Sequence, residues 1–203
     1  MISEALSVKQ KLIKRLLDIT LAIIGVVLSF PVLGLLLIIA AFNTHSSGLL
    51  AQIRIGKDGK PFLLYKLKTM RDDNEASTFI TSATDKRITH FGRFLRKTKL
   101  DELPQLWNVL IGKMSFVGPR PDVPGYADQL QGEDRIILTI RPGITGPASL
   151  AFKDEEELLA KQENPQQYND EVIWPEKVRI NKEYIKNYSL LTDIKIIWKT
   201  VFG

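Results

Sequence analysis

Two adjacent carboxylates, Asp101 and Glu102, lie where a short helix is predicted to begin, and many basic residues surround them in the sequence. Three cations are candidates to meet them in space: Lys66, Arg96 and Arg120. Such a group suits a phosphorylated ligand, because a carboxylate can attack phosphorus or hold a divalent cation while lysine and arginine bind phosphate oxygens. The sequence has no cysteine and only two histidines, which excludes thiolate chemistry and leaves little for a histidine metal site or a Ser-His-Asp triad.

Each of these residues also has an ordinary structural explanation. An Asp-Glu pair at a helix start commonly caps the helix, because acids accept hydrogen bonds from the free backbone N–H groups there. An arginine between two prolines, as Arg120 is between Pro119 and Pro121, is commonly part of a turn. The same prolines reduce the entropy lost in fixing Arg120, whose guanidinium can bind phosphate through two hydrogen bonds. Lys68 lies close enough to Lys66 to leave open which lysine faces the carboxylates.

The elements that must position these residues are a hairpin and two short helices. Apolar-rich runs at Gln52–Ile55 and Phe62–Leu67 flank an Asp-Gly pair, which predicts a small β-hairpin. Arg87–Leu100 has apolar residues at helical spacing and predicts a basic amphipathic helix. Leu103–Ile111 predicts a second short helix that begins beside the two carboxylates.

The rest of the chain reads as a loop and further helices. The polar stretch Asp72–Asp85 predicts a loop, whereas Tyr126–Ile140 and a segment opened by Asp154–Glu157 predict helices. Leu190–Phe202 carries an apolar stripe at helical spacing, which suits either a core contact or a membrane surface. With 203 residues, of which 44% are hydrophobic, the chain can form one packed domain.

Basic residues are concentrated in the first part of the chain. Residues 1–120 hold 18 Lys and Arg against 9 Asp and Glu, whereas residues 121–203 hold 10 against 14. Such a surface suits an anionic partner, whether a phosphorylated ligand, an anionic lipid or a nucleic acid. Charge alone does not choose among these partners.

The run Leu16–Phe42 is almost entirely apolar and long enough to enter a membrane. A secretory signal explains it less well, because the run is longer than a usual signal core and no small-residue cleavage site follows. A single transmembrane helix is the ordinary interpretation. Pro31 argues against it, because it separates Leu16–Phe30 from Val32–Phe42, each shorter than a hydrocarbon core of about 30 Å.

Basic residues flank both ends of this run, and lysine and arginine favour the cytoplasmic side of a membrane. A re-entrant helix that bends at Pro31 and leaves through the same leaflet satisfies both observations, with the Ser29 hydroxyl available to a carbonyl freed at the bend. Asp18 then either pairs with a cation one turn earlier, at headgroup depth, or lies just outside a spanning helix.

Several stretches of the sequence, in order and with natural spacing, resemble the bacterial sugar transferases called monotopic phosphoglycosyl transferases. They are Lys14–Asp18, Arg54–Phe62, Tyr65–Met70, Leu95–Thr98, Leu100–Val109, Gly112–Pro121 and Arg141–Gly146. The resemblance is to the small single-domain members of that family.

The resemblance implies transfer of a sugar 1-phosphate from a UDP-sugar to polyprenyl (undecaprenyl) phosphate, giving a polyprenyl-diphosphate sugar and UMP, with Mg²⁺ as cofactor. This reaction is the first membrane step of surface glycan assembly. It also implies a mainly α fold with a small β-hairpin, in which a re-entrant membrane segment (residues 1–45) precedes a compact catalytic domain with amphipathic interfacial helices (residues 46–203). The catalytic body then lies on the cytoplasmic face of the bacterial inner membrane.

Residue by residue, the resemblance maps the family nucleophile, also a metal ligand, to Asp101 and the acid beside it to Glu102. The matching substrate-binding positions are Lys66, Arg96, Pro119, Arg120 and Pro121. The membrane segment departs from the family pattern, which commonly places serine directly before the proline. Here Phe30 precedes Pro31 and Ser29 lies one residue earlier, so a hinge of Ser29 and Pro31 is expected while the serine-assisted bend stays open.

Two other classes of function remain: a membrane-tethered binder of phosphorylated ligands or nucleic acid, and a membrane-anchored scaffold. The basic stretch has no zinc-finger spacing and no interleaved stacking aromatics, so nucleic acid is not an expected partner. A binder also gives no reason for an Asp-Glu pair among the cations. The sequence leaves open the identity of the UDP-sugar, the glycan pathway and homo-oligomer formation.

Overall fold

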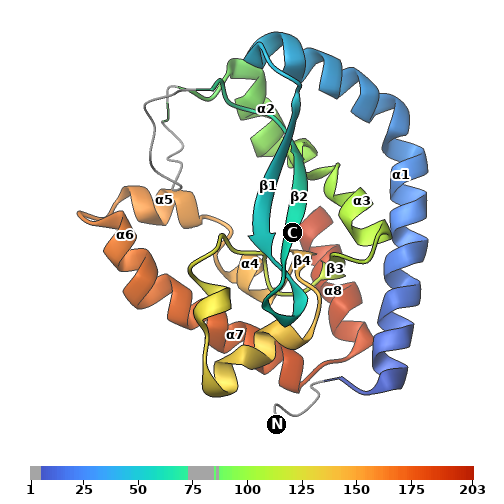
Figure 1. The fold of residues 1–203 in the computed structure, drawn as a ribbon, viewed down its shortest axis with the longest axis vertical. Helices are drawn as coiled ribbons and strands as arrows, with labels where there is room; N and C mark the ends of the chain where they lie inside the picture. Colours follow the sequence, from blue (N-terminus) through green and yellow to red (C-terminus); the bar gives the residue numbers. More distant parts are fainter. Residues whose placement is uncertain (1–5, 73–84, 86) are drawn as a thin grey trace.

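The computed structural model describes residues 6–72, 85 and 87–203, and these residues are mostly helical (Figure 1). The predicted fold class, mainly α with a small β-hairpin, is confirmed. The predicted loop Asp72–Asp85 lies outside the described residues except at its two ends.

In the described residues the α-helices are α1 (Val8–Thr44), α2 (His90–Thr98), α3 (Gln105–Leu110), α4 (Pro147–Ala151), α5 (Glu155–Ala160), α6 (Pro165–Tyr168), α7 (Trp174–Lys186) and α8 (Leu190–Phe202). The strands are β1 (Leu49–Ile55), β2 (Pro61–Leu67), β3 (Ser115–Val117) and β4 (Gly143–Thr145). Short 3₁₀ helices are η1 (Lys57–Gly59), η2 (Leu100–Glu102), η3 (Ala127–Gln129) and η4 (Gly132–Thr139), and a π-helical turn, η5 (Asn169–Ile173), leads into α7.

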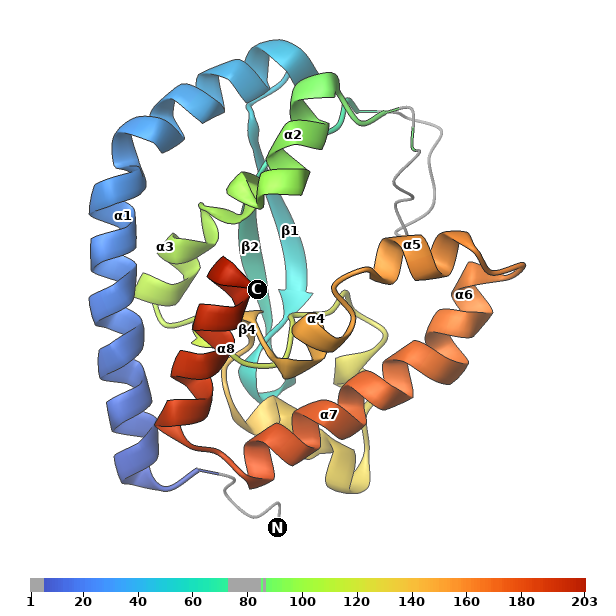
Figure 2. The same ribbon diagram turned by 180° about the vertical axis from the view of Figure 1, so that it is seen from behind.

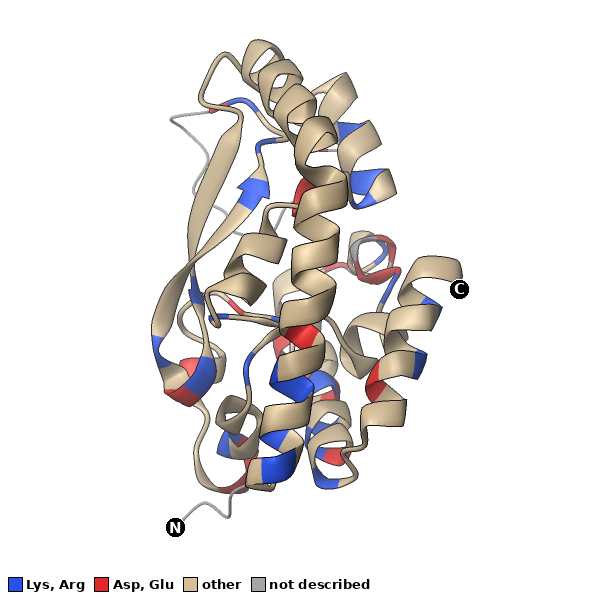
Figure 3. Ribbon diagram, turned by 90° about the vertical axis from the view of Figure 1, so that its right-hand side faces the viewer, with Lys and Arg blue, Asp and Glu red and all other residues tan. Residues whose placement is uncertain are grey.

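The long helix α1 contains the whole apolar run. It begins at a capping box, in which the side chains of Ser7 and Gln10 each accept a hydrogen bond from the other residue's backbone N–H. Within the described residues, α1 is the one helix long and apolar enough to cross a membrane. Most of its large apolar side chains are exposed, and its charged residues lie toward its N-terminal end (Figure 3). Its surface therefore suits lipid better than a protein core.

Pro31 lies inside α1 and does not interrupt it. The prediction that Pro31 separates a helix at Leu16–Phe30 from one at Val32–Phe42 is therefore wrong. One continuous helix instead bends around the rest of the molecule (Figures 1 and 2). A proline inside a helix removes one hydrogen bond and pushes against the preceding turn, and a bend accommodates both effects. We call residues 8–30 the first arm of α1 and residues 32–44 the second arm.

Both arms of α1 contact the remainder of the chain. In the first arm, buried Asp18 accepts hydrogen bonds from Ser115 Oγ at 2.9 Å and from a backbone N–H of β3 at 3.0 Å. In the second arm, Leu36 packs with Leu67 of β2 and Leu95 of α2 in one buried cluster. In the described residues Asp18 makes no direct ion pair with Lys14 or Arg15, although its charge interacts with theirs, and its hydrogen bonds go to β3.

Strands β1 and β2 pair antiparallel over their full lengths, which confirms the predicted hairpin. The strands are joined by the 3₁₀ turn η1, where Asp58 has a φ of 61° and Gly59 a φ of 75°. Aspartate and glycine tolerate this left-handed backbone better than most residues, which explains why the Asp-Gly pair marks the turn.

A second sheet positions the loop that carries Arg120. Strands β3 and β4 pair in parallel, and a Cβ added to Gly143 would lie only 2.2 Å from the Gly118 nitrogen. Glycine is required here because the two backbones approach so closely. Hydrogen bonds from Gly118 N to Thr145 O (2.9 Å) and from Gly143 N to Pro119 O (2.8 Å) then fix the loop to the sheet.

The C-terminal half packs against the hairpin and β3. The segment Tyr126–Ile140, predicted as one helix, forms the 3₁₀ helices η3 and η4, which suit short connections between packed elements. The helix predicted from Asp154–Glu157 is α5, and α8 is observed at Leu190–Phe202 as predicted. Ile196 of α8 joins the core, whereas most of the apolar stripe is exposed. Its exposed members are Leu191, Ile194, Trp198, Val201 and Phe202.

Candidate active site

The carboxylates Asp101 and Glu102 lie in η2, between α2 and α3. Helix α2 ends at Thr98, and its C-cap Lys99 has a φ of 58°, which turns the chain so that the carboxylates follow directly. Helix α3 begins after Pro104, later than predicted, and no side chain at this N-cap position accepts a hydrogen bond from the backbone N–H groups of the first turn. Helix capping therefore does not explain the acidic pair.

Glu102 is the centre of an ion-pair network. Its Oε1 atom accepts hydrogen bonds from Lys66 Nζ at 3.1 Å and from Arg120 Nη2 at 2.9 Å. Burial opposes ionisation of Glu102, but the charges of Arg120 and Lys66 and their hydrogen bonds outweigh it and lower the pKa of Glu102 to about 2. Glu102 therefore stays ionised near neutral pH and holds Lys66 of β2 and Arg120 of the loop after β3 in place.

Asp101 has a different environment from its neighbour. Its side chain is buried, and Oδ1 has no hydrogen-bond partner among the described residues. Burial raises the pKa of Asp101, the charge of Lys66 opposes this rise, and the charge of Glu102 adds to it. An unpaired buried carboxylate oxygen is costly to folding and is typical of functional sites. Among the described residues, Asp101 is therefore the carboxylate of the pair that makes no ion pair, which leaves it available for chemistry.

The structure distinguishes the two candidate lysines. Lys66 contacts Glu102 as described above, whereas Lys68 pairs with Asp72 at 2.6 Å. Burial lowers the pKa of Lys66, and the charge of Glu102 opposes this effect. Lys66 is the lysine that lies at the acidic pair.

Arg96 lies close to the carboxylates without touching them. Its Nε donates to Thr69 Oγ1 at 3.0 Å, and its Nη2 lies 3.0 Å from Met70 Sδ. Its charge still favours the ionised form of Asp101 and lowers that pKa slightly against the effect of burial. The structure therefore brings Lys66, Glu102 and Arg120 into direct contact and leaves Arg96 at the edge of the group.

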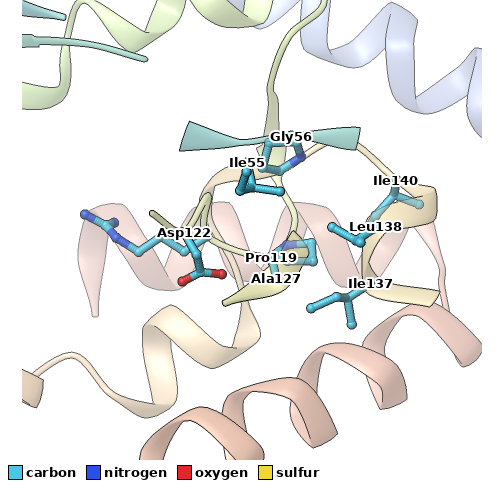
Figure 4. A pocket seen from close by; sticks show the side chains of 10 residues that line it. Ile55, Gly56, Pro119, Asp122, Ala127, Ile137, Leu138 and Ile140 are labelled. Atoms are coloured by element: carbon cyan, nitrogen blue, oxygen red, sulfur yellow. The ribbon is translucent and has the colours of Figure 1, made fainter. Parts of the chain in front are cut away.

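Two small pockets lie on either side of the Arg120 loop. The first is polar and is lined by Arg54, Leu64, Lys66, Gln105, Arg120 and Pro121. The second is mostly apolar, and Figure 4 shows Pro119 and Asp122 beside the core residues Ile137, Leu138 and Ile140. Pro119 and Pro121 thus lie in the walls of different pockets, and the arginine between them is held at the boundary.

A metal ion has limited protein ligands at this site. In the part of the chain that the structure describes, no group of three or more His, Asp or Glu side chains is arranged to hold a metal. Lys66 and Arg120 both contact Glu102 through Oε1, and Asp101 Oδ1 is a buried carboxylate oxygen without a hydrogen-bond partner among the described residues. One or two carboxylates together with substrate phosphates are sufficient for Mg²⁺, so the donor set fits a shared magnesium site.

A model of the family described as "Bacterial sugar transferase" matches residues 9–203, nearly the whole chain. The chain belongs to the bacterial sugar transferase family. This confirms the family expected from the sequence motifs, and the matched region includes all of the site residues described above.

Three named relatives of this sugar transferase family member are between 31% and 37% identical to it over the matched residues. The UDP-glucose:undecaprenyl-phosphate glucose-1-phosphate transferase of Escherichia coli is 37% identical over 97% of this chain, but the match covers only 41% of that relative. The UDP-N-acetylgalactosamine-undecaprenyl-phosphate N-acetylgalactosaminephosphotransferase of Aeromonas hydrophila is 31% identical, over 93% of this chain and 43% of the relative. The sugar transferase EpsL of Bacillus subtilis is 32% identical, and the match covers 94% of this chain and 86% of the relative.

Two positioning residues of this sugar transferase were not predicted. Asn108 of α3, fully buried, accepts from Tyr65 N at 3.1 Å and donates to Leu63 O at 2.7 Å, which ties α3 to the edge of β2. Arg15 of α1 donates to the carbonyls of Val109 (2.6 Å) and Leu110 (2.8 Å) at the end of α3. An asparagine within an apolar helix face was a signal for the first contact, whereas the second joins distant segments that no local pattern connects.

Proposed function

We propose that this protein transfers a sugar 1-phosphate from a UDP-sugar to undecaprenyl phosphate and releases UMP. The names of the Escherichia coli and Aeromonas hydrophila relatives state substrates of these classes. The observation that carries the proposal is the contrast within the acidic pair: Glu102 is ion-paired to Lys66 and Arg120, while buried Asp101 keeps an unpartnered Oδ1. A site built only to bind phosphate needs the cations but not the free carboxylate.

In the proposed reaction Asp101 is the nucleophile. A carboxylate oxygen of Asp101 bonds to the sugar-linked phosphorus of the UDP-sugar, and the bond from that phosphorus to the bridging oxygen breaks, so UMP leaves with the bonding electrons. The phosphosugar is then held on Asp101 as an acyl phosphate. An oxygen of undecaprenyl phosphate bonds to the same phosphorus, the bond to Asp101 breaks, and the carboxylate is regenerated with the polyprenyl-diphosphate sugar as product.

The cations around Asp101 have complementary roles in this scheme. Lys66 and Arg120 lie within hydrogen-bond distance of Glu102 and balance its negative charge. The N–H groups of Lys66 and Arg120 that do not contact Glu102 can then donate to phosphate oxygens. Arg96 adds positive charge at the edge of the site. Asp101 is also the residue proposed to hold Mg²⁺ together with substrate phosphates; when bound, the ion would neutralise charge that develops on the diphosphate.

We also propose that α1 enters and leaves the membrane through one leaflet. Both arms of α1 contact the same body: Asp18 contacts Ser115, and Leu36 packs with Leu67 and Leu95. A helix that crossed the bilayer would place its two arms on opposite sides and lose one of these sets of contacts. The bend at the Pro31 region and the exposed apolar side chains of α1 support this arrangement.

The remaining membrane contacts are proposed for amphipathic helices of the body. Trp107 of α3, Phe94 of α2 and Trp198 of α8 are at least half exposed. Aromatic side chains of this kind are suited to the interface between lipid and water. The catalytic body is then on the cytoplasmic face of the bacterial inner membrane, where UDP-sugars are made.

The decisive experiment uses the full-length protein in detergent with a panel of UDP-sugars. We expect UMP release with undecaprenyl phosphate, and a phosphosugar adduct on the protein with the UDP-sugar alone, detected by intact-protein mass spectrometry. Asp101→Asn is expected to lose both signals, Glu102→Gln to be severely impaired, and chelation of divalent cations to stop turnover. An adduct on the Asp101→Asn protein would remove Asp101 as the nucleophile. Failure of every UDP-sugar to release UMP would overturn the proposed function and favour a non-catalytic phosphate-binding protein.

A further inference from the structure

Arg54 of β1 is a cation that the scheme above does not use. Its Nη2 donates to Gln52 Oε1 at 3.0 Å, while its Nε is buried without a hydrogen-bond partner among the described residues. Within residues 6–72, 85 and 87–203, no carboxylate lies within the 4.0 Å of an ion pair with Arg54. A guanidinium has five N–H donors, so this environment leaves most of its hydrogen-bonding capacity open.

The position of Arg54 connects it to the candidate active site. Arg54 lines the same small polar pocket as Lys66 and Arg120, and Gln105 completes the polar part of the wall. Lys66 and Arg120 are both paired with Glu102, whereas Arg54 has no such partner. Three cations therefore line one pocket, and two of them are paired with Glu102.

The electrostatics of this pocket favour an incoming anion. Burial lowers the pKa of Arg54, and the charge of Arg120 lowers it further, whereas the charges of Asp122 and Glu102 oppose this without forming an ion pair with Arg54. Such a buried donor without an acceptor carries a desolvation cost that a bound anion would remove. A phosphate group has the oxygen acceptors and the negative charge to bond the buried Nε of Arg54 while contacting Arg120.

We infer that Arg54 is a substrate-binding residue that holds a phosphate group in the pocket shared with Lys66 and Arg120. This inference rests on the proposed function and extends it, because it adds a third cation to the phosphate site. The phosphate has two sources, the diphosphate of the UDP-sugar or the phosphate of the lipid. Both present the same oxygen acceptors, and the two steps of the reaction separate them.

The test compares Arg54→Gln and Arg54→Lys with the wild-type protein, with Arg93→Gln as a matched control. Arg93 is exposed on α2 and lies outside the candidate site, so its loss removes one charge without touching the pocket. One assay measures the rate of adduct formation from the UDP-sugar alone. The other measures the rate at which undecaprenyl phosphate discharges a preformed adduct.

Arg54→Gln is expected to lower the rate of adduct formation, of adduct discharge or of both by about tenfold or more, because a charge-assisted hydrogen bond is lost. Arg54→Lys keeps the charge but lacks the planar group with its Nε donor, so it is expected to fall between Arg54→Gln and wild type. A loss confined to adduct formation indicates that Arg54 binds the diphosphate of the UDP-sugar. A loss confined to adduct discharge indicates that it binds the phosphate of the lipid. If Arg54→Gln forms and discharges the adduct at rates within twofold of wild type, the inference is overturned.

A binding measurement keeps the inference testable without turnover. Inorganic diphosphate is expected to raise the thermal unfolding midpoint of wild type and Arg93→Gln, because a ligand that binds the folded state stabilises it. The shift is expected to be lost or strongly reduced in Arg54→Gln and to be intermediate in Arg54→Lys, and an unchanged shift in Arg54→Gln would contradict the inference. If no UDP-sugar forms an adduct while the Arg54-dependent shift persists, the proposed reaction fails but the phosphate site stands.

Discussion

Lys14 Nζ lies 2.6 Å from Asp193 Oδ2, so a buried ion pair joins α1 to α8 across 179 residues of sequence. The Tyr184 hydroxyl donates to the other carboxylate oxygen, and the Tyr188 hydroxyl donates to Oδ2 at 3.3 Å. Lys14 also lies 5.6 Å from the centre of the Tyr188 ring, on its face. This network docks the first arm of α1 on the body, and neither Lys14 nor Asp193 makes a second ion pair in the described residues.

Lys14→Met is expected to lower the free energy of unfolding by about 3 to 5 kcal/mol, because it leaves the Asp193 charge buried and unpaired. The double variant Lys14→Met/Asp193→Leu is expected to recover part of this loss, since it removes both charges. Chemical unfolding followed by tryptophan fluorescence in detergent measures both values. Lys9→Met, at an exposed position of the same arm, is the control, and equal stability of Lys9→Met and Lys14→Met would contradict the prediction.

Asp101→Asn is expected to raise the stability of the fold while abolishing turnover. Because burial raises the pKa of Asp101, its ionised form is less favourable in the folded than in the unfolded chain. The resulting penalty is absent below the unfolded pKa of about 3.9 and appears as the pH rises through the higher folded pKa. Thermal unfolding at several pH values is expected to show a higher midpoint for the variant at pH 7 to 8 and convergence with wild type near pH 4.

Asp58→Asn is the control for this prediction, because Asp58 is exposed in the hairpin turn and asparagine tolerates its left-handed backbone. Its unfolding midpoint is expected to follow that of wild type at every pH. A midpoint for Asp101→Asn at or below wild type at pH 8 would mean that burial of this carboxylate does not strain the fold.

Arg120→Lys is expected to lose more activity than conservation of charge suggests. Arg120 uses Nη2 to contact Glu102, and its other N–H groups remain in a planar fork that a lysine cannot reproduce. The loss of one charge-assisted hydrogen bond corresponds to about a 10- to 100-fold fall in kcat/KM. Steady-state UMP release measures the effect, with Arg93→Lys as control. Nearly full activity in Arg120→Lys would make the rigid loop structural.

Local patterns in the sequence were sufficient for much of the framework around the site. The Asp-Gly pair predicted the hairpin turn, and the helical spacing of apolar residues predicted α2, α3 and α8. The elements that position Lys66, Glu102 and Arg96 were therefore predicted. The acidic pair could be singled out because its residue types suit phosphate chemistry. The roles of its two members could not be separated, because that difference depends on which carboxylate Lys66 and Arg120 reach in space.

Contacts between distant segments could not be predicted in the same way. Asp18 bonds to Ser115, 97 residues away, and no periodicity within α1 indicates this partner. In the sequence Arg54 was one of the basic residues after the apolar run and part of a family-like stretch, and its unpaired Nε beside the pocket that Arg120 lines could not be predicted. The continuity of α1 through Pro31 also depends on tertiary contacts, because packing of both arms against the body can hold a helix that local propensity would interrupt.

The one-leaflet arrangement of α1 predicts that its two flanking regions are accessible from the same side of the membrane. The chain has no native cysteine, so single cysteines at the exposed positions Lys9 and Lys57 can be labelled without background. Both are expected to react with an impermeant maleimide in inside-out vesicles and to be protected in right-side-out vesicles. Labelling of either position from the periplasmic side would refute the arrangement.

Pro31→Leu is the variant that tests the cause of this topology. Leucine restores a backbone donor and removes the ring clash, so α1 is expected to straighten into an apolar helix of about 40 Å over residues 16–42, long enough to span with tilt. A fraction of molecules is then expected to place position 9 outside while position 57 stays inside, because the short N-terminal segment crosses more easily than the charged body. This fraction should increase when Lys14→Met is added, since the Lys14 to Asp193 pair holds the first arm on the body. Identical labelling of Pro31→Leu and its parent would mean that the body contacts, rather than the proline, determine the topology.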